Sequence, residues 1–189
     1  EPLRDRDSGT VTSFGDYSYV GIGLQSDSYG KLTVDDGALL EVLTPDGPNV
    51  GGGINLGIET DAFGELIVDD ASVQIRDTDG VIDSRQGEYG DGPYLNIGRG
   101  GEGRVELREG SELTLQAAST RLLIGDGEQS PDAKGVLNID GDSVFRMITA
   151  PENTRVEDEF SNEHYVAVGR DGGVGEINIT DGGLFQMVG

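Results

Sequence analysis

The sequence predicts an all-β protein, a right-handed parallel β-solenoid (β-helix) of about five three-stranded coils with long loops at one corner. Three observations support this prediction. An apolar–x–apolar–Gly pattern recurs five times, and each copy is followed by two further pairs of alternating apolar residues. Glycine supplies 32 of the 189 residues, as expected for a chain with many sharp turns.

Each unit begins with a short apolar segment that ends in glycine. Alternate residues of a strand point to the same face, so the first and third residues of each copy should face the core. The glycine supplies the positive φ that a sharp corner needs. The five copies are Val20–Gly23, Ile54–Gly57, Leu95–Gly98, Leu122–Gly125 and Val166–Gly169.

Two more strands follow in every unit. A second glycine comes first, and the apolar residues after it are Leu32/Val34, Leu66/Val68, Val105/Leu107, Leu137/Ile139 and Ile177/Ile179. After a turn, the third strands carry Leu40/Val42, Val73/Ile75, Leu113/Leu115, Phe145/Met147 and Phe185/Met187. Every expected inward position is apolar in a chain that is only 34% apolar, which is the signature of half-buried strands.

The extra residues of the longer units collect at one place, between the third strand and the next first strand. The long excursions there are Leu43–Gly53, Arg76–Tyr94 and Ile148–Tyr165. Insertions confined to one corner indicate a stacked array, because a sandwich or barrel would scatter them. We expect residues 19–189 to form the solenoid domain. Residues 1–18, in which Thr10–Phe14 alternates weakly, should be an N-terminal extension that caps the first coil or is donated to a neighbouring copy.

Composition excludes several classes of protein. Without cysteine the chain has no disulfide framework and no thiolate metal site. The formal charge of −23 argues against binding to nucleic acid, which is itself a polyanion. No apolar run approaches the roughly 18 residues of a membrane span, so no membrane insertion is expected.

The last unit carries a family resemblance. Its segments Val166–Gly169, Gly175–Ile179 and Asp181–Gly183, with the pair Phe185/Met187, resemble the glycine-rich repeat of bacterial autotransporter passengers and PEP-CTERM-type exported surface proteins. The resemblance extends from about Tyr19 to Met187 and implies an extracellular or bacterial cell-surface location. It implies no catalytic residues. The chain departs from the family pattern in its long loops and in having Ala71 and Asp142 at a turn position that is otherwise glycine.

These observations favour an extracellular structural or adhesive protein that is not an enzyme. Solenoid ends expose unpaired backbone groups, so we expect a homo-oligomer that stacks end to end into a surface or matrix filament. One alternative is a carbohydrate-active β-helix enzyme, since Arg99, Asp126 and Arg170 occupy one corner position in successive units. Another is a calcium-dependent glycan-binding module. In both alternatives the partner is a polysaccharide, and no cofactor other than calcium is expected.

Two sets of residues are candidate sites. Asp77, Asp79 and Asp83 surround an Asp-Gly turn that resembles part of a calcium loop, although a plain surface turn explains the same residues. Tyrosine precedes the first strand of three units, at Tyr19, Tyr94 and Tyr165. These rings should point outward, where they either stack on sugar rings or lie under the neighbouring loops.

The calcium hypothesis makes a direct prediction. If the loop binds the ion, millimolar calcium should raise the melting temperature, because a ligand that binds only the folded state stabilises it. Asp79→Ala should abolish that rise in a thermal-shift measurement. An equal rise in the variant would instead assign the effect to general screening of the −23 charge.

Overall fold

The computed structural model describes residues 10–13, 19–44, 52–77, 93–117, 120–148 and 164–188. These ranges contain sixteen β-strands and no helix, which confirms the all-β prediction. In chain order the strands are β1 (Thr10–Ser13), β2 (Tyr19–Ile22), β3 (Tyr29–Asp35), β4 (Leu39–Thr44), β5 (Gly53–Leu56), β6 (Phe63–Asp69), β7 (Ser72–Asp77), β8 (Tyr94–Ile97), β9 (Glu102–Arg108), β10 (Glu112–Gln116), β11 (Thr120–Asp126), β12 (Lys134–Ile139), β13 (Val144–Ile148), β14 (His164–Arg170), β15 (Val174–Ile179) and β16 (Leu184–Val188).

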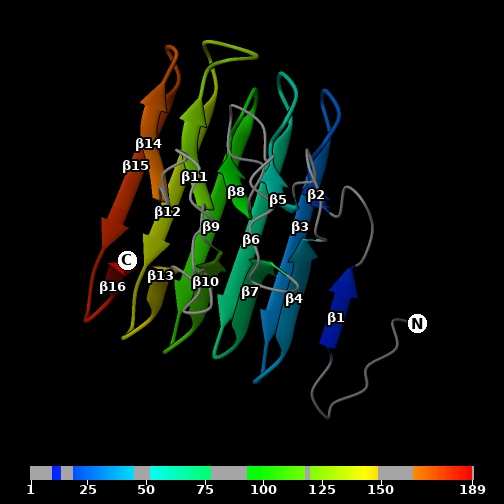
Figure 1. Cartoon of the computed structure of the whole chain (residues 1–189). Helices are drawn as coiled ribbons and strands as arrows, with labels where there is room; N and C mark the ends of the chain where they lie inside the picture. Colours follow the sequence, from blue (N-terminus) through cyan, green and yellow to red (C-terminus); the bar gives the residue numbers. More distant parts are fainter. Residues whose placement is uncertain are drawn as a thin grey trace, which may run out of the picture.

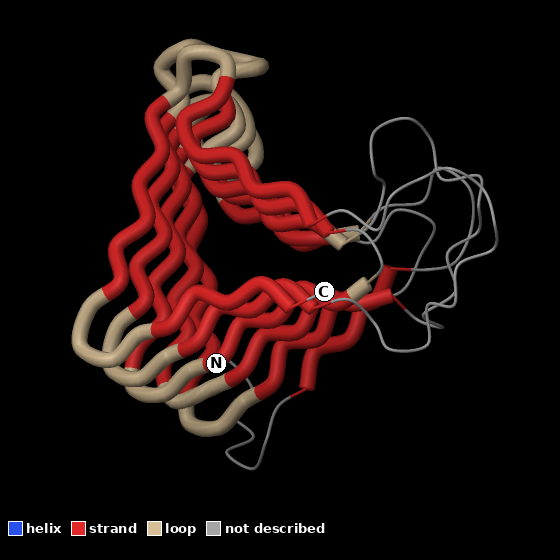
Figure 2. Tube along the Cα trace, turned by 60° about the vertical axis from the view of Figure 1, so that its left-hand side comes forward, coloured by secondary structure: helices blue, strands red, loops and turns tan. Residues whose placement is uncertain are grey.

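The strands form three parallel sheets that make the three sides of a prism (Figures 1 and 2). The first sheet has the order β2-β5-β8-β11-β14, and the second has the order β3-β6-β9-β12-β15. The third sheet, β1-β4-β7-β10-β13-β16, has six strands because β1 adds to the edge of β4. Five complete coils of three strands are therefore stacked, and β1 is an additional strand before the first of them.

The core is a set of columns in which each apolar residue lies above its equivalent in the previous coil. In the second sheet, for example, Leu66, Val105 and Leu137 are register partners and are fully buried. In the third sheet the rings of Phe145 and Phe185 stack at 5.1 Å between centroids. Each fully buried aliphatic side chain contributes about 1.5–3 kcal/mol, and repetition along the columns compensates for the small core of a single coil.

Glycine is required at the corner between the first and second sheets. Gly23, Gly57, Gly98 and Gly125 all have φ between 60° and 71°. A Cβ atom built on any of them would lie 1.9–2.1 Å from a backbone carbonyl oxygen of the following coil. Both the backbone conformation and the close approach of the next coil therefore exclude other residues here.

The variable connections all join the third sheet to the first. They run from β4 to β5, from β7 to β8, from β10 to β11 and from β13 to β14, and their central residues lie outside the described ranges. At the other two corners the connections are short, between two and seven residues long (Figure 2). Connections of different length thus leave the register of the strands on either side unchanged.

The column arrangement predicts a sharp difference between adjacent residues of β12. Leu137 is fully buried, whereas Val136 is half-buried on the outer face beside Arg104 and Glu176. Leu137→Asp should lower the free energy of unfolding by more than about 4 kcal/mol, because it places an unpaired charge in the core. Val136→Asp should cost about 1 kcal/mol or less. Similar losses for both variants in denaturant unfolding would contradict the assigned faces.

Candidate interaction surface

The last coil, β14–β16, leaves one end of the core open. Val168, Ile179 and Met187 are 45%, 49% and 48% exposed, although their equivalents one coil earlier, Ile124, Ile139 and Met147, are completely buried. Val166, Ile177 and Phe185 pack against the core but are only partly covered. The open end is therefore an apolar cross-section of the solenoid, made of the same residue types that are buried in the preceding coil.

The backbone at Gly169 shows the same open end. It has φ of 69°, as the other corner glycines do, and it occupies the same corner position. A Cβ on Gly169 would meet nothing closer than the Gly173 carbonyl oxygen at 3.3 Å, whereas at Gly125 the carbonyl oxygen of Val174 lies 2.0 Å away. The corner of the last coil thus keeps the open space that a following coil occupies elsewhere in the solenoid.

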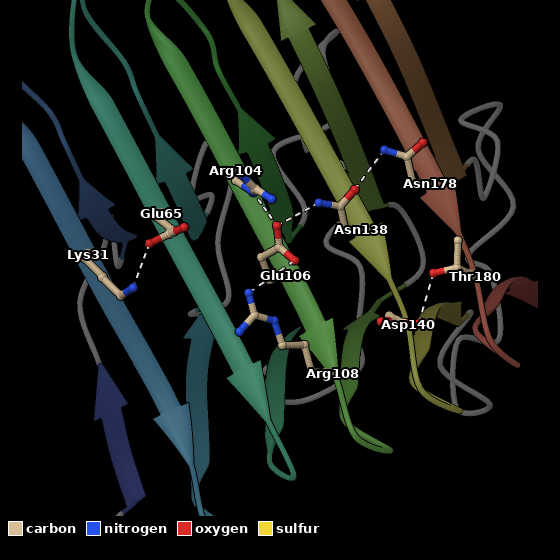
Figure 3. Close-up of polar contacts among 9 residues, drawn as sticks. All are labelled: Lys31, Glu65, Arg104, Glu106, Arg108, Asn138, Asp140, Asn178 and Thr180. Carbon is tan, nitrogen blue, oxygen red and sulfur yellow. Dashed lines mark hydrogen bonds and ion pairs between the residues drawn. The ribbon is translucent and has the colours of Figure 1, made fainter.

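A ladder of polar side chains on the outer face of the second sheet also ends at this coil (Figure 3). Asn138 Nδ2 donates to Glu106 Oε1 at 2.7 Å, and Asn178 Nδ2 donates to Asn138 Oδ1 at 2.8 Å. Each amide donates toward the preceding coil. The carbonyl oxygen of Asn178 is consequently directed to the side on which the described residues contain no further strand.

The Glu106 carboxylate anchors this ladder. It is nearly buried and interacts with the guanidinium groups of both Arg104 and Arg108, which flank it on β9. A buried carboxylate is costly unless it is paired and hydrogen-bonded, and here two arginines and one amide meet that requirement. The outer face of the second sheet is thus held by polar contacts that run across coils.

The three tyrosines predicted as ligand-binding residues lie in one column of the first sheet. Tyr19 pairs with Gly53, Gly53 with Tyr94, Tyr94 with Arg121, and Arg121 with Tyr165. Tyr19 and Tyr165, at the two ends of the column, are about half exposed. The register therefore brings all three residues to one line on the surface, but in alternate coils.

Tyr94 has its own partners within this column. Its ring covers Gly53, where an added Cβ would lie 2.6 Å from Tyr94 Cδ2. Its hydroxyl accepts a hydrogen bond from Asn55 Nδ2 at 3.2 Å, and the Arg121 guanidinium lies 5.5 Å from its ring centre. Burial raises the pKa of the Tyr94 phenol, and this outweighs the opposite effects of Asn55 and of the nearby arginines. Tyr94 thus packs and hydrogen-bonds within the outer surface of the first sheet.

The corner that carries Arg99, Asp126 and Arg170 contains a buried carboxylate. Asp126 is almost completely buried; Arg170 Nε lies 4.0 Å from its Oδ1 and 2.7 Å from Asp171 Oδ2. Burial alone would lower the pKa of Arg170, but the Asp126 and Asp171 carboxylates raise it above its usual value. Arg99 instead pairs with Glu128 at 3.1 Å, and this hydrogen bond and charge lower the pKa of Glu128. The corner is a chain of ion pairs between coils.

Acidic residues gather at the corner between the second and third sheets. Asp36, Asp70, Glu109 and Asp181 have φ between 44° and 54°, in the left-handed region that aspartate tolerates better than most residues. Turn geometry therefore accounts for their position. Within the described residues, no group of three or more acidic or histidine side chains is arranged to hold a metal ion.

Only one of the three candidate calcium ligands lies within the described residues. Asp77 is the last residue of β7, where its backbone is paired with Thr44, while Asp79 and Asp83 lie outside the described residues. The calcium hypothesis stays a prediction. The features that the sequence did not reveal are the polar ladder and the open space at Gly169, because both depend on which residues neighbour each other across coils.

The chain matches no protein-family model, and comparisons with curated proteins and with solved structures find no significant match. Among the described residues, no helix has the length and apolar character needed to cross a membrane.

Tyr94 predicts a pH dependence of stability. Because its pKa is higher in the folded state than in the unfolded chain, its contribution is complete below about pH 10 and is lost as the pH rises through the raised value. In urea unfolding between about pH 8 and 11, the wild type should lose stability more steeply than Tyr94→Phe. Tyr29→Phe, which removes an exposed hydroxyl, controls for the loss of one phenol. Parallel curves for the wild type and Tyr94→Phe would contradict this prediction.

Proposed function

We propose that this protein is an extracellular structural solenoid that associates head to tail, with the open coil β14–β16 of one copy seated on the first coil of the next. The observation that carries this proposal is the open end itself, where an apolar cross-section and unfilled corner space coincide at Gly169. Unpaired strand edges and exposed apolar core residues both favour association.

The first coil, β2–β4, carries apolar residues at the matching position of every column, although Ile22, Val34, Leu40 and Val42 are already buried in the single copy, where β1 pairs with β4. If a second copy continues the register, its Val20 and Ile22 meet Val166 and Val168. In the second sheet, Leu32 and Val34 of the second copy meet Ile177 and Ile179 of the first copy. In the third sheet, Leu40 and Val42 of the second copy meet Phe185 and Met187 of the first. Apolar residues therefore face apolar residues throughout, and Gly23 of the second copy falls above Gly169.

The outer positions are complementary as well. On the second sheet, the exposed Glu176 of one copy would face Lys31 of the next, which already pairs with Glu65 at 2.9 Å. Thr33 of the second copy would lie beside Asn178, where its hydroxyl can donate to the amide oxygen at the end of the polar ladder. On the third sheet Glu41 would lie beside Gln186. Opposite charges and matched donors across such an interface set its register.

Association of this kind yields a filament. Head-to-tail contacts use two different surfaces and do not close, so each copy leaves the same two surfaces free. One copy of five coils would add about 24 Å of length at about 4.8 Å per coil. Tyr165 of one copy and Tyr19 of the next would become neighbours, which continues the tyrosine column as an aromatic pair. A surface or matrix location is consistent with the absence of cysteine and the acidic composition.

Gly169→Ala tests the proposal. The added methyl group should cost the isolated protein only about 1–2 kcal/mol of left-handed backbone strain, because no coil covers it. It should nevertheless abolish filaments seen by light scattering and electron microscopy in about 1 M salt, where the Debye length is only about 3 Å. Filaments formed equally well by the variant would contradict head-to-tail stacking.

Two further variants serve as controls. Gly110→Ala introduces the same type of strain at φ of 80° with nothing within 4 Å, so it should leave assembly intact. Gly125→Ala has a following coil in place and a carbonyl oxygen 2.0 Å from the added carbon, so it should destabilise the solenoid itself. The three variants together separate backbone strain from a collision with a following coil.

A further inference from the structure

Strand β1 occupies the place that the stacking partner needs. It pairs in parallel with β4, with Thr10 opposite Leu39, Val11 opposite Leu40, Thr12 opposite Glu41 and Ser13 opposite Val42. In the first and second sheets, β2 and β3 are edge strands at this end. The described residues thus add a strand before the first coil on only one of its three sides.

The same edge of β4 would receive β16 of a neighbouring copy. Continuing the register of the third sheet aligns Leu184 with Leu39, Phe185 with Leu40, Gln186 with Glu41 and Met187 with Val42. These are the positions at which β1 places Thr10 to Ser13. Only one strand can pair with this edge, so β1 and the partner's β16 exclude each other.

Stacking of β16 onto β1 does not resolve this conflict. Such an arrangement would extend the third sheet, but β14 and β2 would then be separated by two strand spacings, about 10 Å, and so would β15 and β3. The edges of the first two sheets would stay unpaired and the apolar residues of β14 and β15 uncovered. All three sheets become continuous only when β1 has left β4.

We propose that β1 is a displaceable cap that holds the protein in its unassembled state, and that its release from β4 allows head-to-tail stacking. This inference rests on the proposed function. The exchange replaces the four-residue strand β1 by the five-residue strand β16 and covers Phe185 and Met187, so the stacked state gains paired backbone and buried apolar surface. The cap therefore need only be weaker than the contact that replaces it.

A reversible disulfide provides the sharpest test. The chain has no cysteine, and the register partners Thr12 and Glu41 lie on adjacent strands, where the spacing of about 4.8 Å suits a disulfide. In the double variant Thr12→Cys/Glu41→Cys, the oxidised form should remain monomeric at concentrations where the reduced form makes filaments. The reduced form of the same protein is the matched control, since it carries both substitutions.

Removal of residues 1–14 tests the cap from the opposite direction. The truncated chain should assemble at a concentration at least about tenfold lower than the full chain, a difference of about 1.4 kcal/mol. Gly169→Ala in the truncated chain should abolish these assemblies, which distinguishes stacking from non-specific aggregation.

The outcomes separate the two proposals. If the oxidised double variant and the reduced form assemble equally well, and Gly169→Ala still prevents assembly, stacking stands and the role of β1 as a cap is wrong. If the truncated chain stays monomeric at high concentration in screening salt, while retaining its β structure by circular dichroism, head-to-tail stacking itself is wrong.

Discussion

Backbone pairing between successive coils is the constraint on which the structure depends. Each coil lies one strand spacing from the next, so a residue meets its equivalent from the previous unit at a distance of about 4.8 Å. This spacing leaves no room for a side chain at the corner between the first and second sheets, where Gly57, Gly98 and Gly125 meet the carbonyl oxygens of the next coil. It also makes like residues neighbours. Apolar columns and amide ladders follow naturally, whereas a charged residue is stabilised by an opposite charge in the next coil, as Lys31 is by Glu65.

Two features of the molecule have opposite effects on association between copies: the open end favours it and the net charge opposes it. At the end formed by β14–β16, backbone groups and apolar residues such as Ile179 lack the covering that the interior coils have, whereas Ile22 and Val34 of the first coil are buried. The whole chain carries 36 acidic residues against 13 basic ones, and this charge produces a repulsion between copies that acts over about a Debye length. Contact at the ends is short-ranged and repulsion between bodies is longer-ranged. Salt should therefore govern how closely copies approach, and local strand pairing should govern whether they remain together.

Much of the fold could be predicted from sequence because its signals are local. Alternation within five residues identifies Leu137 and Ile139 as inward, and a glycine after an apolar triplet marks each corner. The polar ladder could not be predicted, since Asn138 and Glu106 become neighbours only through the register of whole coils. The burial of Asp126 depends on the same register. Strand β1 alternates too weakly to be assigned, and the calcium ligands would require a loop geometry that three aspartates alone do not specify.

The variable corner between the third and first sheets has a consequence for how such a protein can diversify. Strands β7 and β8 keep their register with their neighbours although the connection between them is far longer than that between β10 and β11. The length of the connection at this corner therefore does not affect how the strands pair. Foreign peptides could be grafted there, one per coil along a single line, without redesign of the solenoid. The glycines between the first and second sheets offer no comparable freedom, because the next coil lies against them.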